Sequence, residues 1–416
     1  MIGELIVRAA LNDHEVVADL LAPGGSAVMI GNARPLISRL IVDAPSAVRR
    51  PQFAEAAAGA GIPFLVDPLT PLLQGETREE DPWAQLVFGR SELTGPSAFA
   101  QRTDRSAYVE QVVDFQLSTG ATAVIPPYPY VTAPDDPWFA VALDWIRLTR
   151  QYLDSHGVAL PMIPVFCGQL MSFGADRAWE GGLNRFAFIA ADCGASGLGL
   201  CLSPAGSGKD SYHKVWRLFQ AFDHVRRVFH GSVIAWRQGV FGPALVASGI
   251  DGYETGIGIS EQSNVRSNIA ARRPPKPGDK PGRGGASGVY LEPLGRSVNP
   301  RVARILLSEM SMRAKVMCTD ERCCPQGVGS TLDHPREHAV RSRARELATL
   351  SALPARSWRL NHIVTKTNAA LTLAKQANRV LEQSEEPLRI HTTGLEALGR
   401  VAEELRRADS EGRIVA

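Results

Sequence analysis

The chain has 416 residues, of which 44% are hydrophobic and 21% charged, and its formal net charge is +2. This composition excludes global disorder, and six cysteines are too few for a secreted disulfide scaffold. No apolar run reaches the roughly 18 residues of a membrane helix, and the first residues lack the basic region of a secretory signal, so we expect a cytoplasmic protein without membrane contact.

Short apolar runs alternate with helical stretches along most of the chain. The runs expected to be strands are 40–44, 62–67, 121–127, 160–168, 185–191, 197–203, 232–239, 250–256 and 288–294. Such alternation predicts βα units around a buried parallel sheet, and their number favours an α/β fold of the (β/α)8 TIM-barrel type. A doubly wound sheet is the alternative, but no GxGxxG follows the first run.

The predicted organisation has three parts. Residues 1–38 are an N-terminal extension, 39–300 form the barrel, and 301–416 form a helical C-terminal subdomain that includes a metal site. Residues 258–287 are a long loop rich in Pro, Gly and Arg, either a disordered insert or a lid that orders on nucleic acid. Residues 265–360 hold 18 Lys and Arg against 8 Asp and Glu, which indicates a polyanionic partner.

A cysteine cluster follows the barrel. Cys318, Cys323 and Cys324 precede His334 and His338 within 21 residues. Three thiolates and one imidazole make a closed tetrahedral Zn²⁺ site, so the zinc would be structural. We expect His338 as the fourth ligand, because His334 precedes a proline that restricts it. Free loop cysteines are the alternative.

Two acids end predicted strands. Asp67 closes the run at 62–67, and Glu254 lies near the end of the run at 250–256. The carboxyl ends of barrel strands face the active site, where two carboxylates can divide the roles of nucleophile and general acid or base. The alternative is that either acid caps the turn that follows.

A third segment, Cys167-Gly168-Gln169, also ends a strand. Glycine lets a flat ligand approach the backbone, and glutamine can both donate to and accept from an amide-bearing ring. Cys167 can instead be a core thiol.

These features occur in the order found in tRNA-guanine transglycosylases and their DNA-modifying relatives. Residues 62–74 resemble the family segment with a strand-end Asp, 165–169 its base-recognition strand, and 248–256 its nucleophile segment. The Cys318, Cys323, Cys324 and His338 set resembles the family's zinc site. The resemblance implies Glu254 as nucleophile, Asp67 as proton carrier, and Cys167, Gly168, Gln169 and Asp251 as substrate-binding residues.

The implied activity is exchange of guanine in a nucleic acid for a 7-deazaguanine base such as preQ0, through a covalent carboxylate–C1′ intermediate. Glu254 stands where the tRNA enzymes have Asp, and such departures favour DNA over tRNA. A homodimer and accessory modification proteins are further partners that the family implies. The rivals are a non-catalytic nucleic-acid-binding subunit of the same fold and an unrelated barrel enzyme acting on a small substrate.

Overall fold

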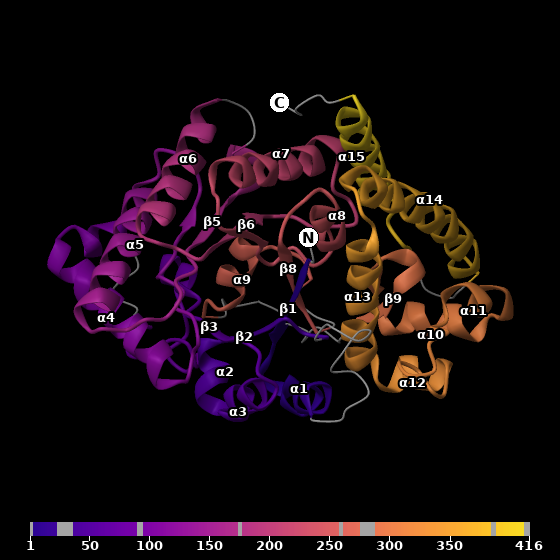
Figure 1. Cartoon of the computed structure of the whole chain (residues 1–416). Coiled ribbons are helices and arrows are strands. Elements are labelled where there is room, and N and C mark those ends of the chain that lie inside the picture. The colour runs from indigo at the N-terminus through magenta and orange to yellow at the C-terminus, as the bar shows by residue number, and fades with distance from the viewer. Residues whose placement is uncertain are drawn as a thin grey trace.

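The protein is described here by a computed structural model of the whole chain. The structure describes residues 3–22, 36–89, 95–173, 177–257, 261–274, 288–383 and 388–411. Figure 1 shows strands in the centre, helices around them, and a group of C-terminal helices along one side.

Eight parallel strands form one curled sheet in the order β3-β2-β1-β8-β7-β6-β5-β4. They are β1 (Glu4–Ala9), β2 (Arg39–Asp43), β3 (Phe64–Asp67), β4 (Tyr130–Val131), β5 (Val165–Gln169), β6 (Gly197–Ser203), β7 (Ser232–Ala235) and β8 (Gly252–Gly256). The segment before β4 closes the ring: Thr122 N donates to Phe64 O (2.8 Å), and Val124 pairs with Met162 ahead of β5. The predicted (β/α)8 barrel is therefore confirmed.

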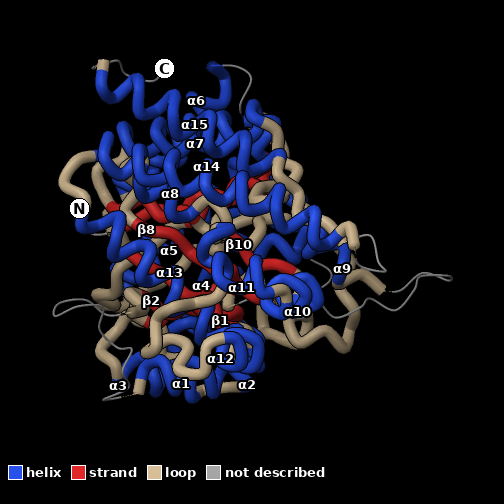
Figure 2. Tube along the Cα trace, turned by 90° about the vertical axis from the view of Figure 1, so that its right-hand side faces the viewer, coloured by secondary structure: helices blue, strands red, loops and turns tan. Residues whose placement is uncertain are grey.

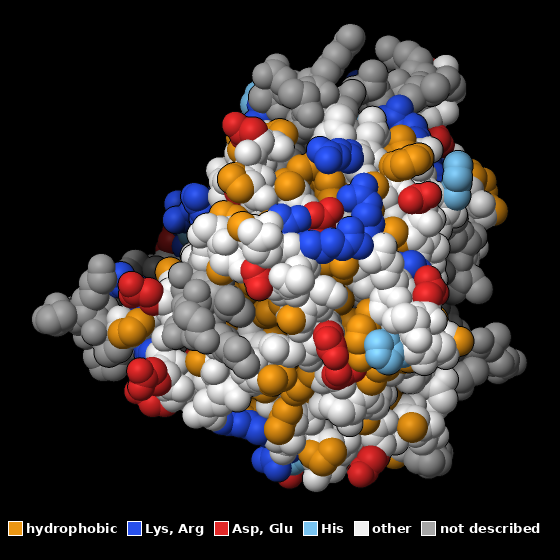
Figure 3. Space-filling model, turned by 90° about the vertical axis from the view of Figure 1, so that its left-hand side faces the viewer, with side chains coloured by type: hydrophobic (Ala, Val, Ile, Leu, Met, Phe, Trp, Pro, Cys, Tyr) orange, Lys and Arg blue, Asp and Glu red, His pale blue; other side chains and the backbone are white. Residues whose placement is uncertain are grey.

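The barrel helices lie outside this ring. They are α1 (His14–Leu21), α2 (Ala44–Arg49), α3 (Gln52–Gly59), α4 (Arg102–Ser118), α5 (Pro137–Ser155), α6 (Arg177–Asp192), α7 (Tyr212–Val228) and α8 (Gly242–Ala247). The start of α5 illustrates the local signals, because Pro137 takes the first helical position and the Asp136 carboxylate accepts from Trp138 N (3.0 Å). On the side of α4–α6, charged groups of both signs are interspersed (Figure 3), and Asp144 there pairs with both Arg105 and Arg147.

The strand pleat determines which side chains enter the barrel. Ile6, Ile41 and Leu65 belong to the interior cluster, and the residues two positions later on the same strands are Arg8, Asp43 and Asp67. Successive side chains alternate between faces, so these charged groups also point inward, one layer nearer the carboxyl ends of the strands. The barrel interior is therefore apolar in its middle layer and charged at the carboxyl ends of the strands, which form its mouth.

The C-terminal part builds a second core beside the barrel. The elements that follow β8 are α9 (Val265–Ala271), which packs on the barrel interior, and then β9 (Val289–Leu291), β10 (Arg296–Val298), α10 (Pro300–Ser308), α11 (Met310–Val316), α12 (Val328–Asp333), α13 (Pro335–Ala352), α14 (Arg356–Leu381) and α15 (Thr393–Ser410). Leu291, Leu306 and Ala374 lie in this second core, whereas Val340 and Leu347 of α13 belong to the core around the barrel. Figure 2 shows the C-terminal helices in front of the strands.

Three sequence predictions are wrong. Residues 1–38 are not simply an extension, because β1 pairs with β2 and β8 inside the sheet. Residues 185–191 belong to α6: Leu183, Phe186, Ala187 and Ala190 are buried at helical spacing, while Phe188 is 68% exposed. Residues 288–294 contribute β9, which pairs only with β10 outside the barrel.

No helix in the described part of the chain is long and apolar enough to cross a membrane. Of the predicted loop 258–287, residues 261–274 are described and include α9. The remainder lies outside the described residues.

Candidate functional site at the barrel mouth

Arg8, on the first barrel strand, joins three carboxylates. Its Nη2 donates to Asp67 Oδ2 (2.7 Å) and to Glu254 Oε2 (3.1 Å). Its Nε donates to the second oxygen of Glu254, and its Nη1 pairs with Asp43. Arg8, Asp67 and Glu254 are all buried. The two strand-end acids predicted from the sequence therefore contact one guanidinium.

Asp67 has the most complete set of partners. Tyr128 Oη donates to its Oδ1 (2.6 Å), Leu69 N to the same oxygen (2.9 Å), and Arg237 Nη2 to Oδ2 (3.2 Å). Burial by itself raises the pKa of this carboxyl, but the charges of Arg8 and Arg237 and the two hydrogen bonds outweigh it and lower the pKa below its ordinary value. Asp67 is thus held ionised.

Backbone strain is concentrated at the same place. Leu69 (φ 54°) and Arg237 (φ 55°) are the non-glycine residues with positive φ in the described part of the chain. Both follow strand ends and both line one small cavity. Strained backbone of this kind is maintained where the surrounding structure fixes it, often at functional sites.

The cavity lies above the barrel interior and has a volume of about 30 Å³. Its polar lining consists of Tyr128, Cys167, Cys201 and Arg237. Burial, and a hydrogen bond to Cys201, raise the pKa of the Cys167 thiol. A volume of this size holds about one water molecule, so no base fits in this conformation.

Helix α9 is what closes the cavity. Val265 and Ile269, one turn apart, face it. The helix is fixed at its start by Val265 N, which donates to Ser203 Oγ (2.9 Å), and at its end by the ion pair of Arg272 with Asp81 (2.7 Å). The sequence predicted a lid or an insert in this region, and its described part covers the mouth.

The predicted substrate-binding residues are only partly brought together. Cys167 lines the cavity, whereas Gly168 and Gln169 continue β5 and are not among the described residues that line it. Asp251 is a correction: it precedes β8 at the opposite end of the barrel, where its carboxylate accepts from Val233 N (2.8 Å). Its carboxylate and its carbonyl oxygen thus accept hydrogen bonds from the starts of β7 and β1, at the end of the barrel away from the Arg8 cluster.

Four residues of the site were missed by sequence reasoning: Arg8, Asp43, Tyr128 and Arg237. Arg8 and Asp43 carry a usable signal, since each lies two positions after a buried apolar residue near the end of a strand. Tyr128 lies in the Pro- and Tyr-rich run 126–131, which can be an aromatic wall for a base or a rigid strand exit, and the sequence favours the rigid exit. Arg237 lies in the loop after β7, and nothing in its local sequence separates it from other loop residues.

The cysteine cluster forms as predicted. The ligand atoms of Cys318, Cys323, Cys324 and His338 all lie within 4.8 Å of one another. His338 Nδ1 is 3.4 Å from Cys323 Sγ and 3.3 Å from Cys324 Sγ, and the two sulfurs are 3.9 Å apart. Ligands at zinc-bond lengths in a tetrahedron would be about 3.5–3.8 Å apart, so the group could hold a metal ion.

The surroundings of the cluster also suit a metal. His338 Nε2 lies 2.9 Å from Tyr290 O, which favours the tautomer with its proton there and leaves Nδ1 for a metal. Hydrogen bonds from Cys323 and Cys324 lower the pKa of Cys318, and the bond between Cys318 and Cys323 raises the pKa of Cys323, so the thiols are in direct contact. His334 is exposed and pairs with Glu337, so His338 is the histidine of this group.

Comparisons with known proteins add little to this geometry. No protein-family model and no curated protein matches the chain. Among solved structures, it is similar to the carboxyl transferase domain of Rhizobium etli pyruvate carboxylase (TM-score 0.38, 11% identity, 100% of this chain and 58% of that one). It is also similar to an aldolase from Escherichia coli K12 (TM-score 0.34, 11% identity, 84% of this chain and 92% of that one). A third similar structure is dihydrodipicolinate synthase from Oceanobacillus iheyensis (TM-score 0.33, 11% identity, 98% of this chain and 96% of that one). The chain thus spans 58% of the length of the first of these.

Proposed function

We propose that the protein is a base-exchange transglycosylase that replaces guanine in a nucleic acid, preferentially DNA, with a 7-deazaguanine such as preQ0. One observation carries the proposal: Asp67 and Glu254, buried at the mouth of the barrel, contact the same nitrogen of Arg8. Because these two bonds are 2.7 Å and 3.1 Å long, the bonded carboxylate oxygens lie less than about 6 Å apart, and a retaining displacement at a sugar carbon uses two carboxylates about 5–5.5 Å apart.

In the proposed reaction, Glu254 is the nucleophile. Its carboxylate attacks C1′ of the target nucleotide, the C1′–N9 bond breaks, and guanine leaves as an anion that takes a proton from water. The incoming base then loses its N9 proton, attacks C1′ and releases Glu254, so the covalent intermediate is resolved with retention. Arg8 donates to both oxygens of Glu254 and so orients the carboxylate before the reaction.

Asp67 is the proton carrier of this scheme. Because its pKa is held below the ordinary value, Asp67 is ionised at rest, which suits the removal of a proton from the incoming base. Asp67 then passes the N9 proton of the incoming base to water, which replaces the proton that the departing guanine took. Tyr128 and Arg237, which touch both Asp67 and the cavity, would orient the base.

A metal has a separate role in this proposal. Cys318, Cys323, Cys324 and His338 would hold one Zn²⁺ with a full set of protein ligands, and the ion would stabilise the C-terminal fold without taking part in the exchange. The basic segment 265–360 would supply contacts to phosphates.

A second function is favoured by one observation. Both oxygens of Glu254 are engaged by Arg8, and Glu254 is 1% exposed. A nucleophile must be free of such a partner when it attacks, so a non-catalytic nucleic-acid-binding subunit with the same fold is the alternative.

Radiolabelled guanine exchange into duplex DNA and bulk tRNA, with zinc measured in the same preparation, tests the proposal. Label in one polymer, lost in Glu254→Gln and kept in Asp251→Asn, would support it. Asp251→Asn is the matched control, because it makes the same change at the other end of the barrel. Zinc with nucleic-acid binding but no label would favour the binding subunit, and neither zinc nor label would favour an unrelated barrel enzyme.

A further inference from the structure

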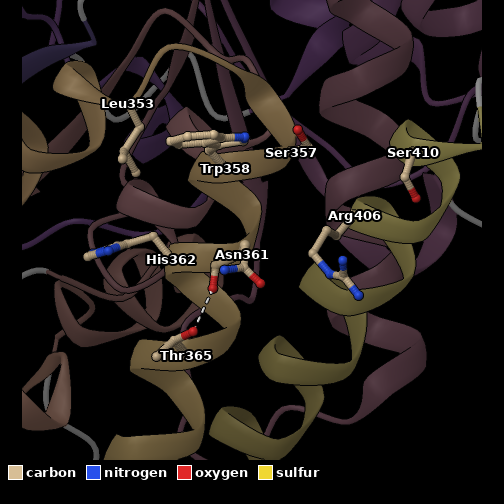
Figure 4. A pocket seen from close by; sticks show the side chains of 8 residues that line it. All are labelled: Leu353, Ser357, Trp358, Asn361, His362, Thr365, Arg406 and Ser410. Atoms are coloured by element: carbon tan, nitrogen blue, oxygen red, sulfur yellow. Dashed lines mark hydrogen bonds between the residues drawn. The ribbon is translucent and has the colours of Figure 1, made fainter.

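An open groove lies between the start of α14 and the end of α15, away from the barrel mouth. Its volume is about 510 Å³, within the range of about 300–1,000 Å³ typical of ligand sites. The α14 residues that line it are Ser357, Trp358, Asn361, His362 and Thr365, which share one helix face. Arg406 and Ser410 line it from α15, and Figure 4 shows Ser357 and Asn361 between Trp358 and these two residues.

Trp358 is the main apolar element of the groove. Its side chain is 62% exposed, which is unusual for the largest apolar residue. It lies in the first turn of α14, and Leu353 lies beside it at the edge of the groove (Figure 4). The ring offers a flat surface for stacking, and the neighbouring hydroxyl and amide groups offer hydrogen bonds.

The charge around the groove is positive. No carboxylate lines it among the residues that the structure describes. Glu403 is shared by Arg406 and Arg407, so these three groups keep one net positive charge. Arg406 donates its Nε and Nη2 to Glu403 (both 2.9 Å), so an anion beside Trp358 would bind its remaining nitrogen, Nη1.

A second group of arginines borders the groove near Leu353. Arg359 Nη1 donates to Leu353 O (3.3 Å), while its buried Nε has no partner in the described part of the chain. Burial, and then the charges of Arg356 and Arg226, lower the pKa of Arg359. Arg356 in turn pairs with Asp409 (3.3 Å) and lies 3.9 Å from Asp223, so these acids balance part of the positive charge beside the groove.

The groove is distinct from the proposed active site. Arg356, in the same turn as Trp358, donates to Ser248 O (2.8 Å), and Ser248 precedes the amino end of β8. The Arg8 cluster lies at the carboxyl ends of the strands. The two sites are therefore at opposite ends of the barrel.

We propose that this groove binds single-stranded DNA, with one base stacked on Trp358 and the adjoining phosphate on Arg406. An exposed aromatic ring, hydrogen-bonding groups without a carboxylate, and an excess of guanidinium groups are what an unpaired nucleotide requires. The inference shares the nucleic-acid partner with the proposed function but needs no catalysis. It would let the protein hold a displaced strand while another part of the DNA occupies the mouth.

Fluorescence anisotropy of a labelled 12-nucleotide oligothymidylate, with the full-length protein, tests this. Trp358→Ala should weaken binding about tenfold, as expected for loss of one stacked base, and Trp358→Phe should restore most of it. Arg406→Gln should weaken binding and reduce its salt dependence. The matched control is Phe188→Ala, which removes another exposed aromatic ring, on α6.

Guanine exchange by the wild type is measured in parallel, so failure of this inference and failure of the proposed function give different results: exchange with unchanged oligothymidylate binding in Trp358→Ala overturns this inference alone, whereas weakened binding in Trp358→Ala without any exchange by the wild type counts against the proposed function alone. Unchanged binding by Trp358→Ala, or an equal loss in Phe188→Ala, would overturn the inference. Binding of oligouridylate but not oligothymidylate would also overturn it. A changed oligomeric state of Trp358→Ala, with unchanged oligothymidylate binding, would overturn it too and would assign the groove to contact with a second copy of the chain.

Discussion

Arg8 holds the charged mouth of the barrel together. Asp67 and Glu254 are buried, and Arg8 is the cation that both contact. A buried ion pair contributes little net stability by itself, because desolvation offsets attraction, but removing one partner leaves the other charge buried and uncompensated. The cost of losing Arg8 should therefore exceed that of losing either acid.

Replacement of Arg8 by methionine should lower the free energy of unfolding by about 3–5 kcal/mol, because two carboxylates lose their shared partner. Arg39→Met is the matched control: Arg39 pairs with Glu4 on the same pair of strands, but both are partly exposed, so a loss below about 1 kcal/mol is expected. Urea unfolding measures both. Equal losses would mean that the charges at the mouth are well hydrated.

Asp67 should make stability depend on pH. Its pKa is lower in the folded protein than its ordinary value, so it stabilises the fold above that value, and this contribution disappears as the pH falls towards the lowered pKa. The stability difference between wild type and Asp67→Asn should be largest at neutral pH and shrink below about pH 4. Urea unfolding from pH 7 to pH 3 measures it. A difference that is independent of pH would show that Asp67 acts through packing alone.

At this scale the sequence was partly informative. Asp67 and Glu254 could be predicted because each ends a recognisable apolar run. Arg8 was overlooked because the first strand was assigned to an extension, although its inward position follows from the pleat once β1 is recognised. Arg237 could not be predicted, because its role depends on a strained loop conformation that its neighbours impose.

Helix α9 is the element that decides access to the mouth. Its apolar face contacts the cavity, while one ion pair with Asp81 restrains its C-terminal end. A base that enters the cavity beside Cys167 must displace this helix, as flipped bases enter enclosed pockets. Opening should therefore be a distinct step.

Asp81→Ala should make α9 open more often. The lost ion pair corresponds to about 0.5–1 kcal/mol, so the Cys167 thiol should react with N-ethylmaleimide about two- to fivefold faster. Peptide mass spectrometry separates Cys167 from the other cysteines. Asp154→Ala, which breaks an exposed pair with Arg150, is the control and should leave the rate unchanged. The same rate in both variants would show that α9 is not restrained by Asp81.

Element types were harder to predict where a short apolar run has two explanations. Residues 185–191 are apolar enough for a buried strand, and only the wider spacing of buried positions from Leu183 to Ala190 identifies a helix. Val289 to Leu291 do form a strand, but its place outside the barrel depends on pairing with residues 296–298, which local sequence does not specify.

At the scale of the whole molecule, α13 connects the metal group to the barrel. His338, near the start of this helix, belongs to the Cys3His group. About one and a half turns later, Arg343 donates to Gly239 O (2.8 Å) and to Glu261 Oε1 (2.6 Å), in the segments that follow β7 and β8. Val340 and Leu347 pack in the core around the barrel. A single helix thus carries contacts to the metal group and to the core around the barrel, so the metal should stabilise more than its own loop.

Removal of the metal should therefore destabilise the entire chain. Cys324→Ser, or chelation of the wild type, should remove about one zinc per chain and lower the melting temperature by at least ~5 °C, because structural zinc contributes folding free energy directly. Cys193→Ser is the matched control, since Cys193 is a buried free cysteine outside the metal group. Elemental analysis and scanning calorimetry measure the two quantities. If only the C-terminal part melted earlier, in a separate transition, α13 would not couple the metal group to the barrel. If Cys324→Ser and Cys193→Ser behaved alike and no zinc were found, Cys318, Cys323, Cys324 and His338 would be a packed cluster without a metal. The stability of the C-terminal part would then have to come from its apolar core alone.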